Sequence, residues 1–297
     1  MNKNIKLAIL GGDARQRYLA RELADRGFET AVWGIGGDAR IGEAVKCRDP
    51  KSALSSASAV ILPLPVTLDG ATLNSENEEK LKLNAILDYS DALIFGGKFN
   101  ESFLHAAEVR KRRVIDYFES ETLQIRNAVP TAEGAVSIAM QHLDKTVMGC
   151  RAAVVGYGRI GQMLAGLLLR MGAEVTVAAR NLLQLAVAKN FGAKILRLDP
   201  ALPSGGLLPL CESGAFDVVF NTVPARLFDA EVLSFMPADI LLIDLSSVPG
   251  GVDFGVAKER GIRAVWALSL PGKYAPESAG SIICDTLMEY FEREGIT

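Results

Sequence analysis

The chain of 297 residues is long enough for two domains, and its 49% hydrophobic and 23% charged residues are ordinary for a globular protein. A formal net charge of −3 gives no electrostatic reason to expect DNA, RNA or an anionic membrane as a partner. The four cysteines form no CxxC pair and no cluster with histidine, which excludes a zinc ribbon and a disulfide scaffold.

Residues 1–6 carry neither the apolar core nor the cleavage site of a signal peptide. Apolar runs in the sequence stay shorter than the roughly 18 residues that a membrane span requires. We therefore expect a cytoplasmic protein that holds no metal ion and binds neither membrane nor nucleic acid.

Short apolar runs alternate with longer helical patterns along the chain. In the first part they predict strands over residues 7–10, 30–33, 59–64, 92–95 and 114–118, with a helix over 14–26 closed by Gly27. A second series predicts strands over residues 152–155, 175–178, 216–222, 240–245 and 264–268. Because the runs are almost entirely apolar, helices are expected on both faces of each sheet. The predicted fold class is α/β, with two Rossmann-like, doubly wound parallel-sheet domains.

The two series of strands predict a boundary near residue 130. Residues 1–129 are expected to form an N-terminal substrate domain of flavodoxin-like type, and residues 130–274 a dinucleotide-binding domain. Pro130 and Thr131 as start signals and Gly149 as a stop predict a connecting helix over 130–148. A last helix over 276–293, in the tail 275–297, has no strand after it and is expected to pack back on the first domain.

The most informative motif is a glycine pattern that follows the strand beginning at Arg151. It reads Gly156, Tyr157, Gly158, Arg159, Ile160, Gly161 and leads into a helix, which is the G-x-G-x-x-G fingerprint in its proper context. The first glycine permits the tight turn, the second lets the backbone approach a pyrophosphate, and the third allows close packing of helix and strand. The start of the helix offers free N–H groups to phosphates.

The end of the next strand indicates which dinucleotide is bound. An NAD site normally places Asp or Glu about 20 residues beyond the glycines, on the ribose hydroxyls. Here the strand ends with Ala179, Arg180 and Asn181, so the carboxylate is missing and Arg180 can pair with a 2′-phosphate. NADP(H) is favoured over NAD(H), and the alternative is that Arg180 is only a surface residue.

Other segments at predicted strand ends complete the candidate site. Thr222, Val223 and Pro224 follow one strand of the second series, and Ser246 follows the next. They are expected beside the cofactor. In the first domain, Gly11-Gly12-Asp13 lacks a third glycine, and Asp13 suits a helix N-cap, so a second dinucleotide site is not expected there.

Two histidines are candidates for acid–base chemistry. His105 falls in a plain helical pattern and is expected at its surface, whereas His142 lies on the connecting helix. His142 is either a proton acceptor or donor near neutral pH or a packed histidine without chemistry, and the sequence leaves both interpretations open.

Taken together, the motifs resemble the family formed by the A subunit of dipicolinate synthase, which belongs to spore formation. The resemblance spans the whole chain, through residues 8–16, 59–63, 129–134, 141–142, 156–161, 178–180, 221–224, 249–254 and 270–276. The opening GGDARQ and the segment PGG-x-DF are more specific than the Rossmann glycines.

The resemblance implies an activity and a partner. It implies NADP-dependent oxidation of a dihydrodipicolinate-type precursor to dipicolinic acid, in the cytoplasm of the mother cell during sporulation. It implies that the partner is a flavoprotein-like second subunit of the synthase, and it implies a two-domain layout similar to that of D-2-hydroxyacid dehydrogenases. Two-domain dehydrogenases are often dimers, so a homo-oligomer is expected.

A pyridine dicarboxylate needs two anion-binding groups and a proton acceptor, which suggests roles for several residues. Arg15 with the helix end at Gly12 is a candidate for one carboxylate, and Lys273 or exposed amides around Gly250 and Gly251 for the other. His142 or Glu133 is the candidate proton acceptor.

Two alternative functions remain to be weighed. A 2-hydroxyacid-dehydrogenase-like reductase would need a histidine near the last strand, and no histidine occurs after His142, which rules out the usual form of that chemistry. A non-catalytic NADP(H)-binding subunit that regulates a flavoprotein partner stays open, because acid–base residues are scarce.

Overall fold

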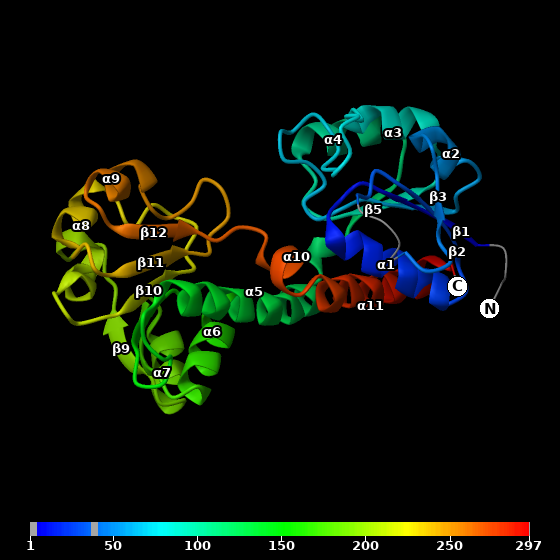
Figure 1. The fold of residues 1–297 in the computed structure, drawn as a ribbon. Helices are drawn as coiled ribbons and strands as arrows, with labels where there is room; N and C mark the ends of the chain where they lie inside the picture. The colour runs from blue at the N-terminus through cyan, green and yellow to red at the C-terminus, as the bar shows by residue number, and fades with distance from the viewer. Residues whose placement is uncertain (1–4, 37–40, 297) are drawn as a thin grey trace. The chain divides into compact units, whose positions relative to one another are not determined.

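The structure is a computed structural model that describes residues 5–36 and 41–296, so residues 1–4, within the stretch that lacks signal-peptide features, lie outside it. The chain divides into two compact units (Figure 1). Unit 1 comprises Met1–Asn127 and Pro271–Thr297, and unit 2 comprises Ala128–Leu270. Each unit contains one six-stranded parallel sheet with helices on both faces, so the predicted α/β fold class is confirmed.

The sheet of unit 1 has the strand order β3-β2-β1-β4-β5-β6. Its strands are β1 (Lys6–Leu10), β2 (Glu29–Trp33), β3 (Val45–Lys46), β4 (Ala59–Ile61), β5 (Leu93–Gly96) and β6 (Val114–Asp116). The helices are α1 (Ala14–Asp25), α2 (Pro50–Leu54), α3 (Leu83–Tyr89), α4 (Glu101–Val109), the 3₁₀ turn η1 (Tyr117–Glu119) and α11 (Pro276–Glu294). The order reverses between β1 and β4, which is where sheets of this type bind ligands.

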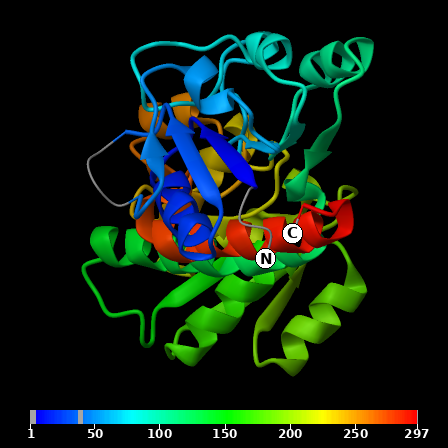
Figure 2. The same ribbon diagram turned by 90° about the vertical axis from the view of Figure 1, so that its right-hand side faces the viewer.

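Alternation along β1 shows how the two faces of this sheet are filled. Leu7 and Ile9 are fully buried in the core beneath α1 and α11, and Ala8 and Leu10 in the core beneath α2, α3 and α4. Helix α11 lies beside α1, as both views show (Figure 2). Gly280 permits this close approach, because a Cβ atom there would come within 2.7 Å of the Arg15 carbonyl oxygen.

The sheet of unit 2 has the order β12-β11-β10-β7-β8-β9. Its strands are β7 (Arg151–Val155), β8 (Glu174–Ala179), β9 (Lys194–Arg197), β10 (Val218–Asn221), β11 (Leu241–Asp244) and β12 (Arg263–Trp266). Its helices are α6 (Arg159–Arg170), α7 (Leu182–Asn190), η2 (Pro203–Gly206), η3 (Leu208–Cys211), α8 (Ala230–Phe235) and α9 (Phe254–Glu259). Helix α5 (Glu121–His142) enters from unit 1, and α10 (Leu270–Tyr274) leads back to it.

The prediction for the connecting helix was wrong at both ends. Helix α5 begins at Glu121, nine residues before the predicted start, and Pro130 lies inside it. Ser120 marks the start of α5, because its Oγ accepts a hydrogen bond from Leu123 N at 3.3 Å as an N-cap side chain does. The two edge strands β3 and β9 were also missed, because one has two residues and the other is largely exposed.

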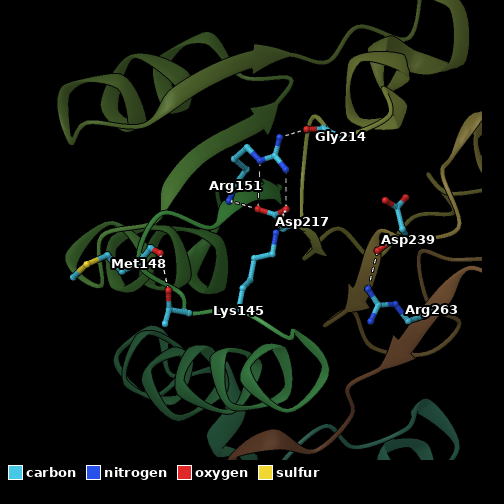
Figure 3. A network of polar contacts seen from close by, with 8 residues as sticks. Lys145, Met148, Arg151, Gly214, Asp217, Asp239 and Arg263 are labelled. Carbon is cyan, nitrogen blue, oxygen red and sulfur yellow. Dashed lines mark hydrogen bonds and ion pairs between the residues drawn. The ribbon is translucent and has the colours of Figure 1, made fainter.

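A cluster of polar contacts holds the start of unit 2 together at the amino edge of its sheet (Figure 3). Asp217, which is nearly buried, accepts from Lys145 Nζ at 2.8 Å, Arg151 N at 2.8 Å and Arg151 Nη2 at 2.9 Å. These bonds join the loop after α5 to β7 and β10. Burial alone would raise the pKa of Asp217, but hydrogen bonds from Arg151 and Lys145 outweigh it and hold that pKa well below its usual range.

We predict that Asp217→Asn lowers the free energy of unfolding by about 2 kcal/mol at pH 7, because charge-assisted bonds to a nearly buried group are lost. The lowered pKa means that this contribution is complete above the unfolded pKa of about 4 and disappears as the pH falls. Chemical denaturation of the unmodified protein and the variant at pH 7 and pH 3 measures the loss of stability and its dependence on pH. Glu174→Gln is the control, since its pair with Lys194 is exposed and should contribute under about 0.5 kcal/mol. Equal losses in the two variants would contradict the assignment.

Candidate functional site

The turn between β7 and α6 is shaped by three glycines with different constraints. Gly156 has φ +94°, and a Cβ atom there would overlap Thr222 Oγ1. A Cβ atom at Gly161 would overlap the carbonyl oxygen of Gly156. Around Gly158, in contrast, an added Cβ atom would meet nothing within 4 Å. The first and third glycines therefore close the turn, and the second leaves its outer side open, as a pyrophosphate site requires.

The same turn leaves the start of α6 without a side-chain cap. Gly158 is the N-cap residue of this twelve-residue helix and offers no side-chain acceptor. Helices α1, α7 and α8 are capped by Asp13, Asn181 and Asp229. The positive end of the α6 dipole therefore lies at the carboxyl edge of the sheet without an acceptor from an N-cap side chain, which suits an anion.

The residues predicted after β8 lie at this same edge. Ala179 is buried at the end of the strand, Arg180 is exposed, and Asn181 caps α7 by accepting from Leu183 N at 2.8 Å. Residues 178–181 contain no carboxylate. The charged side chain at the end of this strand is therefore a guanidinium group and not a carboxylate.

Thr222 and Val223 close the other side of the turn. Thr222 Oγ1 donates to the Val155 carbonyl at 2.9 Å, and Val223 packs next to Gly156, while Pro224 is exposed. The structure thus brings together the glycine loop and the loop after β10.

Asp244, which the sequence analysis did not single out, organises the next loop. This fully buried carboxylate accepts from Asn221 Nδ2 at 2.9 Å, Ser246 Oγ at 2.7 Å and Gly251 N at 2.7 Å. Ser246 is therefore buried and bonded to Asp244. The only sequence signal was an acidic residue at the end of the apolar run 240–245.

The same loop corrects the expectation of exposed amides at Gly250 and Gly251. Both residues are buried; Gly250 N donates to the Ser247 carbonyl at 2.9 Å, and Gly251 N to Asp244. Both donors are used within the loop, so they do not form an anion site.

His142 and Glu133 do not lie beside the glycine loop. His142 ends α5 at the opposite, amino edge of the sheet, where its carbonyl accepts from Arg263 Nη1 at 3.0 Å, and its Nδ1 is 2.9 Å from the Ile138 carbonyl. Glu133 is exposed on a shallow groove of about 450 Å³ between α5 and the end of α6, with Leu167 and Met171. A connecting helix that leads into the amino end of β7 cannot place its last residue at the carboxyl end. Within unit 2, neither candidate proton acceptor, His142 or Glu133, therefore lies at the carboxyl edge of the sheet.

In unit 1 the carboxyl ends of β1 and β4 form a second candidate site. Gly11 and Gly12 follow β1 with φ +68° and +95°, and Asp13 caps α1 by accepting from Arg15 N at 3.0 Å, as predicted. Gly272 approaches this turn closely, since a Cβ atom there would lie 2.6 Å from Asp13 Oδ2. Its neighbour Lys273 is exposed. The motif GGDAR and the segment PGKY, far apart in sequence, thus meet within unit 1.

Arg15 is not a free cation at this site. It is 5% exposed, and its Nε and Nη2 donate to the two oxygens of Asp13 at 2.8 Å. Nη2 also donates to the Leu64 carbonyl at 2.5 Å. Burial raises the pKa of the Asp13 carboxyl, but the hydrogen bonds and the charge interaction with Arg15 lower it by more, so that pKa lies below its ordinary value. The two side chains therefore form an ion pair without net charge. Arg15 holds the turn after β1 against the segment after β4.

Within residues 5–36 and 41–296, no group of three His, Cys, Asp or Glu side chains could hold a metal ion. None of the helices in these ranges has the length and apolar content that crossing a membrane would demand.

The sequence also matches known proteins over almost its full length. Residues 6–118 match the family model for the N-terminal domain of the A subunit of dipicolinate synthase. The chain is 33% identical over 298 residues to the A subunit of dipicolinate synthase from Bacillus subtilis strain 168, covering 97% of this chain and 96% of that protein. The chain belongs to this family, that of the dipicolinate synthase A subunits. The family resemblance expected from the motifs is confirmed.

Solved structures of this family have the same fold. The crystal structure of the dipicolinate synthase A subunit from Bacillus halodurans matches with a TM-score of 0.84 and 30% identity, covering 96% of this chain and 97% of that one. The A chain from Bacillus subtilis matches with a TM-score of 0.82 and 31% identity, covering 97% and 96%. Apo D-lactate dehydrogenase from Escherichia coli matches at 16% identity and a TM-score of 0.62, covering 99% and 98%, which shows a shared dehydrogenase-like fold.

We predict that Gly161→Ala lowers the free energy of unfolding by about 2 kcal/mol, because its Cβ atom would press on the Gly156 backbone. Gly166→Ala in the same helix is the control. Its Cβ atom would meet only the flexible end of Arg170 at 3.8 Å, so better helix propensity should raise stability by up to about 1 kcal/mol. Urea denaturation of both variants measures the contrast, and a neutral Gly161→Ala would show that the turn is not closely packed.

Proposed function

We propose that this chain is the NADP-dependent dehydrogenase subunit of a two-subunit synthase, which oxidises a dihydrodipicolinate-type precursor to dipicolinate. Membership of the family of dipicolinate synthase A subunits supports the product class. The observation that carries the redox role is the glycine turn of unit 2, with its open Gly158 and the uncapped start of α6.

The residues present fit a phosphorylated dinucleotide. Gly156, Gly158 and Gly161 shape a cradle for the pyrophosphate, and the positive end of the α6 dipole, without an N-cap side chain, would favour its charge. Arg180 at the end of β8 supplies a planar donor for a 2′-phosphate. Thr222 and Val223 form the wall on the side of β10. When bound, NADP⁺ supplies the hydride acceptor that the protein itself lacks.

The oxidation balances with few protein groups. A dihydropyridine dicarboxylate loses one ring hydrogen as hydride to NADP⁺ and a second as a proton, and the ring becomes aromatic. In unit 1, exposed Lys273 near the Asp13–Arg15 pair is the cation available to a substrate carboxylate. With His142 and Glu133 away from the carboxyl edge of unit 2, we assign the proton to solvent.

One observation favours a second candidate function. Neither predicted acid–base residue of unit 2 lies at the edge where the cofactor would bind, which suits a subunit that senses NADP(H) and regulates its partner. The partner in both cases is the flavoprotein-like second subunit of the synthase. We place this work in the cytoplasm of the mother cell during sporulation, with this chain forming a homo-oligomer.

The two functions separate in one assay. Purified protein, alone and with the flavoprotein-like partner, receives freshly generated dihydrodipicolinate and NADP⁺, while NADPH and dipicolinate absorbance are followed. A parallel rise of both with this protein alone supports the dehydrogenase. Dipicolinate without NADPH, and only with the partner present, would assign the chemistry to the flavin and regulation to this chain.

We predict that Arg180→Ala weakens NADPH binding about tenfold, because a charge-assisted bond to the 2′-phosphate is lost, and leaves NADH binding unchanged. Fluorescence titration of both cofactors measures the ratio. Arg170→Ala, which removes an exposed cation from the far end of α6, is the control and should leave both affinities as they are. If Arg180→Ala weakens the binding of NADPH and NADH equally, the guanidinium group does not bind the 2′-phosphate.

A further inference from the structure

Gln16 has a side chain whose burial and lack of partners no structural role explains. It is 0% exposed, and among the described residues its Nε2 and Oε1 are the buried side-chain atoms without a hydrogen-bond partner. Asp244 is equally buried, yet it accepts from both protein N–H and O–H donors. Buried amides are almost always paired, so an unpaired one points to a partner from outside the chain.

The helix itself offers Gln16 a partner that it does not use. Asp13 is the N-cap of the twelve-residue helix α1, which makes Gln16 the third residue of the helix. Glutamine at that position commonly turns back to the N–H of the capping residue. Gln16 instead lies against Gly12, where an added Cβ atom would be 2.5 Å from its Oε1. The amide is therefore directed at the turn that ends β1.

This turn is the place in unit 1 where a ligand is expected. It follows β1 at the point where the strand order reverses toward β4. Gly12 N donates to the Asn74 carbonyl at 2.7 Å, so the segment after β4 borders the same turn. The switch in strand order and the unpaired amide of Gln16 coincide at Gly12.

The charged side chains beside the turn at Gly12 leave it without net charge. Asp13 and Arg15 form a neutral ion pair beside Gly12. A neutral amide can be buried here, and its Nε2 donates without an ionised partner. A Leu or Met side chain of similar volume would fill the space without unpaired atoms.

We propose that Gln16 recognises the edge of the substrate on which a carboxylate stands next to the ring nitrogen. Nε2 donates to a carboxylate oxygen, and Oε1 accepts from the ring nitrogen when that nitrogen carries a proton. This inference rests on the proposed function, because that function supplies a pyridine-2,6-dicarboxylate ring. Gln16 is thus a specificity residue that was not among the candidates from sequence, although it adjoins Arg15.

Binding must uncover the amide, since protein atoms cover both of its polar atoms. The glutamine side chain supplies that movement by rotation about its own bonds, without displacement of α1. Arg15, locked to Asp13 and to the Leu64 carbonyl, keeps the turn in place while Gln16 moves.

The test compares two glutamines of unit 1 by calorimetry with pyridine-2,6-dicarboxylate, with the 3,5-isomer as the control ligand because its carboxylates stand away from the nitrogen. Gln16→Leu should weaken binding of the 2,6-isomer about tenfold, the loss expected for one bond to a charged group. Its melting temperature should stay unchanged or rise, because unpaired polar atoms are removed. Gln124→Leu should lower the melting temperature and leave binding of the 2,6-isomer unchanged, because Gln124 Nε2 donates to the Phe118 carbonyl at 2.8 Å.

Each other outcome overturns the inference in a distinct way. If Gln16→Leu lowers the melting temperature and leaves the 2,6-isomer bound, the amide holds an internal water and not the substrate. If the variant weakens both isomers equally, Gln16 does not read the edge beside the nitrogen. If the unmodified protein binds NADPH but neither isomer, the substrate of the proposed function is wrong as well, and the inference falls with it.

Discussion

In each unit the central strand is followed at once by a glycine at positive φ, and the architecture of the carboxyl edge depends on that turn. Gly11 N donates to the Trp33 carbonyl at 2.7 Å, and Gly156 N to the Ala178 carbonyl at 2.8 Å, so both turns bond to the end of the neighbouring strand. A side chain at either position would overlap the segment after β4 or β10. The missing side chains therefore allow three chain segments to meet at each edge.

The two edges then differ in the charge at the start of the following helix. Asp13 places a carboxylate at the start of α1 and pairs with Arg15, so the positive end of that helix is already satisfied. Gly158 leaves the start of α6 without a cap. The same topology thus presents a capped helix start beside an ion pair in unit 1 and a helix start without a side-chain cap in unit 2.

Sequence reasoning succeeded where a local pattern has one physical solution. Apolar strand runs and the glycines of 156–161 fix the sheets and the turn, because buried strands and positive φ leave few alternatives. It failed where the position of a residue depends on the three-dimensional path of the chain. His142 is a plausible base by chemistry, but the helix that carries it ends at the amino edge, and only the three-dimensional path shows this. Gly250 and Gly251 looked exposed because the sequence does not show that Asp244 is buried beneath them.

The buried polar side chains at the two edges differ in how many hydrogen bonds they make. Asp244 accepts several hydrogen bonds, which tie both Ser246 and Gly251 to the end of β11. Gln16 makes none, so its conformation is held by packing alone. In the proposed reaction, Gln16 gains hydrogen-bond partners only when the substrate binds, whereas Asp244 has its partners before any ligand binds. This difference in hydrogen bonding between Asp244 and Gln16 agrees with the proposal that unit 2 binds the dinucleotide and that the turn after β1 contacts the ring.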